Sequence, residues 1–257
     1  MIPKVIHYCW FGRNPLPPLA KECIASWKKF LPDYEIKEWN EDNFDVNIIP
    51  YTAEAYKQKK YAFVSDYARF WILYHYGGLY FDTDVEIIRP MDDIIEKGAF
   101  MGFELDPDGE NSPLKYAPKY AFSVALGLGF GMEKSHPFLM KMLNVYKKLR
   151  FEKPDGSPYY RTIVSYTTEG LMEYGLENVK GIQTVCGVTI YPSEYFAPLN
   201  VVTHKLKITE NTRTIHRYMA SWEEKKDKSI KGIIQHYMPE SILILVNRIK
   251  RRKYRIA

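Results

Sequence analysis

The chain has 257 residues, 46% of them hydrophobic, which is enough for the core of one large domain or of a domain with a small appendage. The net charge of +5 is local, because six basic residues and no acidic one fall in residues 248–255, and this argues against a nucleic-acid surface across the domain. The three cysteines form no C-x-x-C pair, so neither a disulfide framework nor a zinc site is indicated. The N-terminus has no apolar core typical of a signal peptide, and we expect a cytoplasmic protein.

The N-terminal part alternates between strand and helix patterns. Residues 2–11 predict a strand, 19–30 a helix and 34–39 a second strand, which is typical of an α/β domain with a largely parallel sheet. Trp10 lies at the carboxyl end of the first strand, where open α/β sheets bind nucleotides. Its indole either stacks on a base or belongs to the core, and its position alone leaves both interpretations open.

Residues 61–88 form the most informative stretch. The aromatic residues at 63, 67, 70 and 74 have the spacing of a buried helical stripe. Gly77 and Gly78 then end the helix and turn the chain. An apolar strand that carries acidic residues comes after the two glycines. This stretch therefore predicts a helix, a two-glycine break and a strand.

Two pairs of charged residues stand out in that stretch. Asp82 and Asp84 are two residues apart, so on an extended backbone both side chains leave the same face. Two carboxylates on one face suit a divalent cation that stays partly open to a phosphate. Asp66 and Arg69 are three residues apart and share another face of the preceding helix. The two pairs are expected to line one cleft.

The second half of the chain gives a looser pattern. We expect a strand at 99–104, helices at 138–150 and 162–174, and paired short strands at 179–191. The loop at 106–118 has the length of a lid or binding loop. Residues 121–132 are rich in small side chains, which favours either a buried strand pair or a wall that a ligand approaches closely.

Two features near the C-terminus have open alternatives. His216 lies in an aromatic setting and either completes a metal shell begun by the two aspartates or is simply packed. In residues 241–257 an apolar run precedes the basic cluster. This pattern suits contact with an anionic membrane surface, but also a solvated helix docked on the domain.

Four segments together resemble glycosyltransferase family 32. They are S-D-x-x-R at 65–69, G-G-x-Y-x-D-x-D at 77–84, the first strand at 2–12 and the H-x-x-x-x-S-W element at 216–222. A lone DxD is weak evidence, but this combination in this order is specific. The resemblance extends to the glucosyltransferase domain of the large glucosylating toxins, whereas residues 100–209 match only loosely.

The resemblance implies a GT-A-type nucleotide-diphospho-sugar transferase fold, α/β with a mixed, mostly parallel sheet flanked by helices. Residues 1–237 would form this domain, with a donor half at about 1–98 and an acceptor half at about 99–237. Residues 238–257 would be a basic amphipathic tail. Members of the family are retaining enzymes. We expect transfer of a hexose or N-acetylhexosamine from a nucleotide sugar, UDP-linked by analogy, to a saccharide or lipid-linked acceptor in surface polysaccharide synthesis.

By the same resemblance, Asp82 and Asp84 hold a divalent metal, Mn²⁺ or Mg²⁺, against the diphosphate, and His216 is the third protein ligand. Such an ion stabilises the departing nucleoside diphosphate as a Lewis acid. Asp82, Asp84 and Arg69 would therefore be the catalytic residues, with Arg69 adding positive charge.

The resemblance also implies six residues that contact the donor, one of which is Asp82. Asp66 and Arg69 would bind the sugar hydroxyls, and Trp10 would stack on the base. Tyr80 and Trp222, together with Asp82, would border the nucleotide and its phosphates. No convincing nucleophile emerges from the sequence, which favours same-face transfer guided by the leaving phosphate.

Two other functions fit parts of the pattern. A haloacid-dehalogenase-like phosphotransferase also has a DxD after an apolar strand and would use Asp82 as nucleophile, but no late acidic pair follows Glu133 in a suitable apolar setting. A non-catalytic sugar- or cation-binding module is the other alternative. The intact set of acidic, arginine and histidine residues argues against it.

Overall fold

The computed structural model describes residues 1–107, 122–200 and 205–219. Trp222, the tail at 238–257 and most of the loop at 106–118 lie outside the described residues, so the expectations that concern them stay predictions. Among the described helices, none is both long and apolar enough to cross a membrane.

In the described part of the chain, the core of the fold is an eight-stranded mixed sheet with the strand order β2-β1-β3-β7-β5-β9-β8 and with β6 paired to β5. β1 pairs in parallel with both β2 and β3. β7 runs antiparallel between β3 and β5, and β5 pairs in parallel with β9. The predicted mixed α/β class is therefore confirmed. The strands are β1 Val5–Cys9, β2 Glu35–Trp39, β3 Gly78–Tyr80, β5 Phe100–Leu105, β6 Ser123–Ala125, β7 Phe130–Met132, β8 Gln183–Val185 and β9 Val188–Tyr191.

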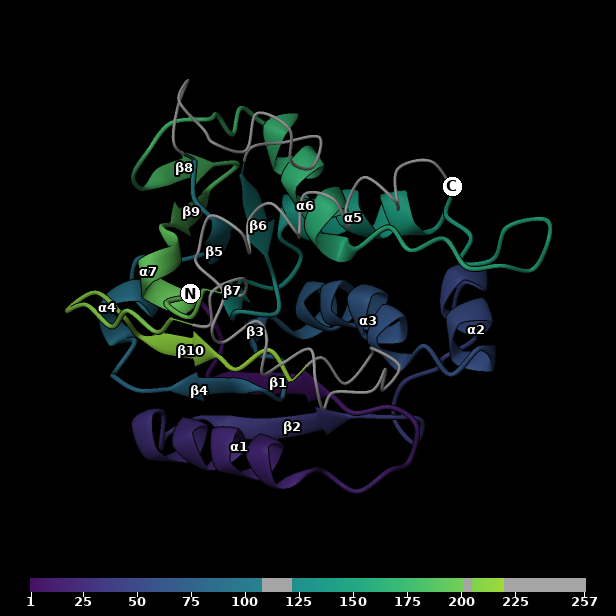
Figure 1. The fold of residues 1–257 in the computed structure, drawn as a ribbon, viewed down its shortest axis with the longest axis horizontal. Coiled ribbons are helices and arrows are strands. Elements are labelled where there is room, and N and C mark those ends of the chain that lie inside the picture. Colours follow the sequence, from purple (N-terminus) through teal and green to yellow (C-terminus); the bar gives the residue numbers. More distant parts are fainter. Residues whose placement is uncertain (108–121, 201–204, 220–257) are drawn as a thin grey trace.

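Helices cover both faces of this sheet, with α1 on one side of β1 and β2 and α3 on the other (Figure 1). The alternation along β1 explains the two layers, because Tyr8 packs on Trp27 of α1 while Cys9 belongs to the cluster around α3. The helices are α1 Pro18–Phe30, α2 Pro50–Lys57, α3 Tyr61–Tyr76, α4 Asp92–Ile95, α5 Pro137–Tyr146, α6 Ile163–Met172 and α7 Ser193–Phe196.

The junction between α3 and β3 is tightly built. Gly77 ends the helix at φ +66°, and a Cβ on Gly78 would lie 2.6 Å from the carbonyl oxygen of Val5, so both positions require glycine. Trp39 Nε1 donates to His7 Nδ1 at 3.0 Å, which leaves the proton on Nε2, and Nε2 donates to the Gly77 carbonyl at 3.0 Å. Burial lowers the pKa of His7 to about 4, so this imidazole is neutral.

The strand predicted through Asp82 and Asp84 is interrupted, which corrects the expectation that both carboxylates leave one face. β3 ends at Tyr80, and a turn follows in which the Val85 amide donates to the Asp82 carbonyl at 3.0 Å. The chain then leaves the main sheet as β4 Val85–Ile87, which pairs antiparallel with β10 Thr214–His216 in a separate two-stranded sheet. The same-face argument required an extended backbone, and the turn removes that premise.

Candidate active site

The site lies at the carboxyl ends of neighbouring parallel strands. Trp10 follows β1 and Asp82 follows β3, so both reach the same edge of the sheet, as predicted for the tryptophan. Trp10 is partly exposed, and its Nε1 donates to the carbonyl of Asn14 at 2.6 Å. It borders a hollow of about 230 Å³, which is lined by Trp10, Arg13, Asn14, Glu38, Asn40 and Glu41. Stacking of the indole on a base stays a prediction.

Arg69 contacts two of the carboxylates that were predicted for the site. Its guanidinium contacts Asp82 through both terminal nitrogens, at 3.3 and 3.2 Å, and Asp66 at 3.5 Å. Arg69 Nε donates to the Ser65 carbonyl one helical turn back at 3.1 Å. Only 4% of Arg69 is exposed, because α3 is buried continuously over 63–70. The structure thus brings Asp66, Arg69 and Asp82 together.

Tyr80 completes this cluster. Its hydroxyl donates to Asp82 Oδ1 at 3.2 Å, and the Arg69 guanidinium carbon lies 4.8 Å from its ring centroid. Burial acts to lower the pKa of Arg69, but the charge of Asp82 and the other acidic neighbours raises it above its ordinary value. Arg69 is therefore a permanent cation. Tyr80 is 1% exposed, and its predicted place beside the nucleotide is untested.

Gly127 is a site residue that the sequence argument missed. A Cβ there would lie 2.2 Å from Asp82 Oδ2, so the carboxylate rests directly on the glycine backbone. The Asp82 amide also donates to the Gly127 carbonyl at 3.3 Å, and Thr214 Oγ1 donates to the Leu128 carbonyl at 3.3 Å. The turn between β6 and β7 thus contacts both Asp82 and β10. The signal was the run of small residues at 121–132, which predicted either a buried strand pair or a wall that a ligand approaches; the group that approaches Gly127 is the Asp82 side chain.

Asp84 faces a different partner, His216. His216 Nε2 lies 3.1 Å from Asp84 Oδ1, and the Met219 amide donates to Asp84 Oδ2 at 2.8 Å. The Arg217 amide donates to the Asp84 carbonyl at 2.9 Å. Residues 216–219 therefore wrap around Asp84, whose side chain is 12% exposed. The structure brings His216 to Asp84 alone, one of the two aspartates whose metal shell it was expected to complete, and its role as a metal ligand stays a prediction.

The two groups of this pair shift each other's pKa in opposite directions. Burial acts to lower the pKa of His216, but the hydrogen bond and charge of Asp84 outweigh it and the net shift is upward. Burial acts to raise the pKa of Asp84, but the contact with His216 outweighs it and the net shift is downward. The buried Nδ1 atom of His216 has no hydrogen-bond partner within the described part of the chain. The Tyr218 ring packs edge-on against the imidazole at 4.2 Å.

The donor set of this pair fits a metal ion. A separation of 3.1 Å between His216 Nε2 and Asp84 Oδ1 is that of two adjacent ligands, each about 2.1 Å from one octahedral ion. Carboxylate and imidazole together suit a transition metal such as manganese. In the described ranges, however, no three His, Cys, Asp or Glu side chains come close enough to hold an ion. Asp82, the other predicted ligand, is turned toward Arg69 and does not join Asp84 and His216.

Residues 17–101 match the family model described as glycosyltransferase sugar-binding region containing DXD motif. This match confirms the resemblance to glycosyltransferase family 32, and it includes Asp66, Arg69, Asp82 and Asp84. It covers neither Trp10 nor the stretch around His216.

Three proteins illustrate the similarity. Inositol phosphoceramide mannosyltransferase 1 of Schizosaccharomyces pombe is 29% identical over 133 residues, which are 47% of this chain and 40% of that protein. An uncharacterized glycosyltransferase of Acanthamoeba polyphaga mimivirus is 25% identical over 212 residues, 80% of this chain and 76% of that one. The solved PaToxG glycosyltransferase superposes with a TM-score of 0.46 at 21% identity, covering 67% of this chain and 69% of that chain.

The names of these relatives are those of glycosyltransferases, the class of protein that the sequence predicts. The chain spans about two fifths of the length of the Schizosaccharomyces pombe mannosyltransferases that it matches, 40% in one and 38% in the other.

Proposed function

We propose that this chain, which carries the DXD-containing sugar-binding region of glycosyltransferases, is a metal-dependent glycosyltransferase. It would move a sugar from a nucleotide sugar to an acceptor hydroxyl. The observation that carries the proposal is the pairing of the two DxD carboxylates with different partners. Asp82 lies on the buried cation Arg69, and Asp84 lies 3.1 Å from the imidazole of His216.

In this proposal Asp84 and His216 hold the metal, with Asp82 as the further predicted ligand. When bound, the ion supplies Lewis-acid stabilisation to the departing diphosphate. Imidazole in the donor set favours Mn²⁺ over Mg²⁺, which prefers oxygen ligands and keeps its waters. The chain's own contribution is to keep the two donors adjacent, through the backbone contacts of residues 217 and 219 to Asp84.

Arg69 and Asp66 would orient the donor sugar. Burial raises the pKa of Asp66 to about 7, so near neutral pH its carboxyl group can both accept hydrogen bonds from sugar hydroxyls and donate to them. Its 3.5 Å contact with Arg69 fixes its direction. Arg69 brings a permanent positive charge next to the DxD sequence, where negative charge develops on the leaving group. Because this cation is already buried and positioned, no reorganisation is needed when the bond breaks.

We propose transfer with retention of configuration. The carboxylates of Asp66 and Asp82 are both held by Arg69, and that of Asp84 is held by His216, so all three are poor nucleophiles. A direct same-face step guided by the leaving phosphate avoids the need for one. The same contacts weigh against the phosphotransferase alternative, because Asp82 would have to attack while bound to Arg69 and Tyr80.

The named relatives make mannose the first sugar to test and a phosphoinositol-containing lipid the first acceptor, alongside other hexoses, N-acetylhexosamines and saccharides. The nucleotide is either UDP, as expected from the resemblance, or GDP. A lipid-linked acceptor would suit a cytoplasmic protein that touches the inner membrane face through residues 241–257, as in surface polysaccharide synthesis.

The proposal is tested with a panel of UDP- and GDP-sugars and Mn²⁺, scored for nucleoside diphosphate release with and without acceptors. We expect release from one donor class, its loss with EDTA and its recovery on adding Mn²⁺. Absence of binding and release with every donor would refute the transferase. Binding without turnover would indicate the binding module, and a phosphorylated Asp82 would indicate the phosphotransferase.

A further inference from the structure

The strand that carries His216 is short and lies outside the main sheet, although its Thr214 hydroxyl contacts the carbonyls of Leu128 and Phe196. Within the described residues, β10 has three residues and pairs with β4 alone in a two-stranded sheet, with Thr214 opposite Ile87 and His216 opposite Val85. Two strands alone are marginally stable. A slip of one residue in this register would turn His216 to the opposite face. Other contacts must therefore hold the register that places the imidazole beside Asp84.

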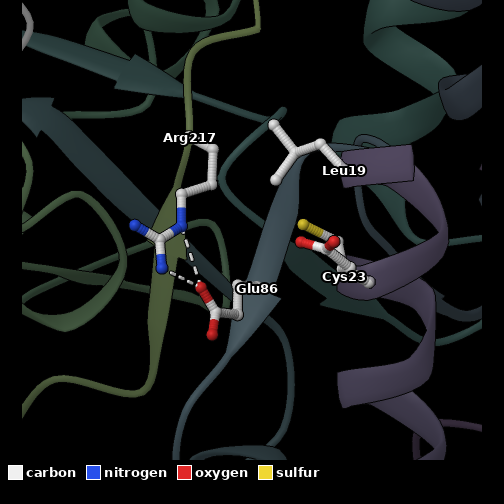
Figure 2. Close-up of a pocket in the computed structure, with 5 residues that line it drawn as sticks. Leu19, Cys23, Glu86 and Arg217 are labelled. Carbon is white, nitrogen blue, oxygen red and sulfur yellow. Dashed lines mark hydrogen bonds and ion pairs between the residues drawn. The ribbon is translucent and has the colours of Figure 1, made fainter. Parts of the chain in front are cut away.

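Arg217, the residue after β10, makes such a contact. Its Nε donates to Glu86 Oε2 at 2.8 Å, and its Nη2 contacts the same oxygen. Its backbone amide donates to the Asp84 carbonyl at 2.9 Å. Arg217 thus contacts the residues on both sides of Val85, and Val85 is the residue that pairs with His216. Figure 2 shows the pair bridging the two strands, opposite Leu19 and Cys23 of α1 across a hollow of about 240 Å³.

A second arginine lies at the other end of the same strand. Arg213 contacts Asp93 at 2.9 and 3.3 Å and also donates to the carbonyls of Glu210 and Asn211. Its side chain is 15% exposed, compared with 35% for Arg217, so it is the more deeply anchored of the two. Both arginines tie β10 down, but only Arg217 is adjacent to the histidine. The chain therefore contains its own matched control.

We infer that Arg217 and Glu86 are positioning residues that hold His216 in register against Asp84 and thereby set the affinity for the divalent metal. The inference rests on the proposed function for its metal. A partly exposed ion pair contributes little to global stability, so its main consequence is local. Partners that orient a metal ligand typically change metal affinity by about 10–100-fold when they are removed.

The test compares Arg217→Met with Arg213→Met in the full chain. Mn²⁺ binding is measured directly, from the electron paramagnetic resonance signal of free Mn²⁺ and without donor, and the Tm of each variant is recorded. We expect Arg217→Met to bind Mn²⁺ about 10-fold more weakly with a small change in Tm. Arg213→Met should lower the Tm more and leave Mn²⁺ affinity within about twofold of the unaltered chain, because it acts away from the ligand.

Two further variants test the pair itself. Glu86→Gln should weaken Mn²⁺ binding to a similar extent, and the double variant Glu86→Gln/Arg217→Met should add no further loss, because both changes remove one interaction. Arg217→Lys keeps the charge but loses the contact through two nitrogens. Its Mn²⁺ affinity should lie between those of the unaltered chain and Arg217→Met. It also preserves the test if the methionine variant does not fold.

Unchanged Mn²⁺ affinity in Arg217→Lys and Glu86→Gln would overturn the inference, and so would an equal loss of affinity in Arg213→Met. Failure of the proposed function gives a different result. The unaltered chain would then bind Mn²⁺, and the 217 variants would weaken it, while no nucleotide sugar released its nucleoside diphosphate. If the unaltered chain bound no Mn²⁺, the positioning role would fall together with the metal assignment.

Discussion

Asp82 and Asp84 are two residues apart, yet they belong to different parts of the molecule. Asp82 is attached to the main sheet and to α3, where Arg69, Tyr80 and Gly127 surround it. Asp84 lies past a turn, in the small β4–β10 sheet, where His216 and residues 217–219 surround it. Asp82 is paired with the permanent cation Arg69. Asp84 is paired with a histidine, a residue type that titrates and that binds metal ions. We propose from this comparison that Asp84 is the main protein carboxylate on the metal ion, and that Asp82 contributes less to metal binding and more to the orientation of the donor.

The largest effect is expected where the Asp82 side loses its cation. Arg69→Met leaves the buried Asp66 and the partly exposed Asp82 without their partner, and we expect a loss of about 3–5 kcal/mol in the free energy of unfolding. Urea denaturation measures it. The isosteric removal of one anion, Asp66→Asn, serves as the control and should cost less. A methionine variant as stable as the unaltered chain would show that the cluster is not an ion-pair network.

On the other side, Asp84→Ala should reduce turnover by about 10²–10³-fold without a comparable loss of stability, because the change removes a positioned group rather than a structural cation. Nucleoside diphosphate release at saturating donor and Mn²⁺ measures this effect, with Asp93→Ala as a control carboxylate outside the site. Activity within a few-fold of the unaltered chain would make the metal assignment wrong.

Low pH should lower the free energy of unfolding through His7, which lies on the Asp82 side of the molecule. The folded-state pKa of His7 is lowered to about 4, so between pH 6.5 and 4 the unfolded chain binds the proton that the folded chain does not. Stability from this group is present above pH 6.5 and is lost as the pH falls, on the order of 2 kcal/mol by pH 5. In His7→Gln, which retains a donor and an acceptor, this part of the pH dependence should disappear. If both proteins lose stability in parallel, the imidazole is not the titrating group.

A smaller effect should follow from Gly127→Ala. The new methyl group would displace the Asp82 carboxylate from its place on the turn, and the free energy of unfolding should fall by about 1–3 kcal/mol. The Michaelis constant for the donor should rise more than the Mn²⁺ concentration for half-maximal activity, because Asp84 and His216 are untouched. A variant in which the Mn²⁺ requirement rises instead would contradict the division between the two carboxylates.

Much of the Asp82 side could be predicted because its signals are local. The aromatic spacing of α3 and the double glycine at 77 and 78 indicated the helix and its end, and three-residue spacing placed Asp66 and Arg69 together. The Asp84 side depends on contacts distant in sequence. The turn after Asp82 broke the period-two argument, and the pairing of β4 with β10 joins Glu86 to Ile215 with no local pattern that would predict it. Gly127 reaches Asp82 only through the sheet order, which the sequence does not specify.

The most direct test of this division is Mn²⁺ binding to Asp82→Asn and Asp84→Asn, measured side by side by electron paramagnetic resonance in the absence of donor. Both substitutions remove one negative charge from the same turn, so a general electrostatic effect would weaken both equally. We expect Asp84→Asn to lose Mn²⁺ binding by about 10–100-fold and Asp82→Asn to lose clearly less. Equal losses, or a larger loss in Asp82→Asn, would contradict the assignment of the metal to Asp84 and His216.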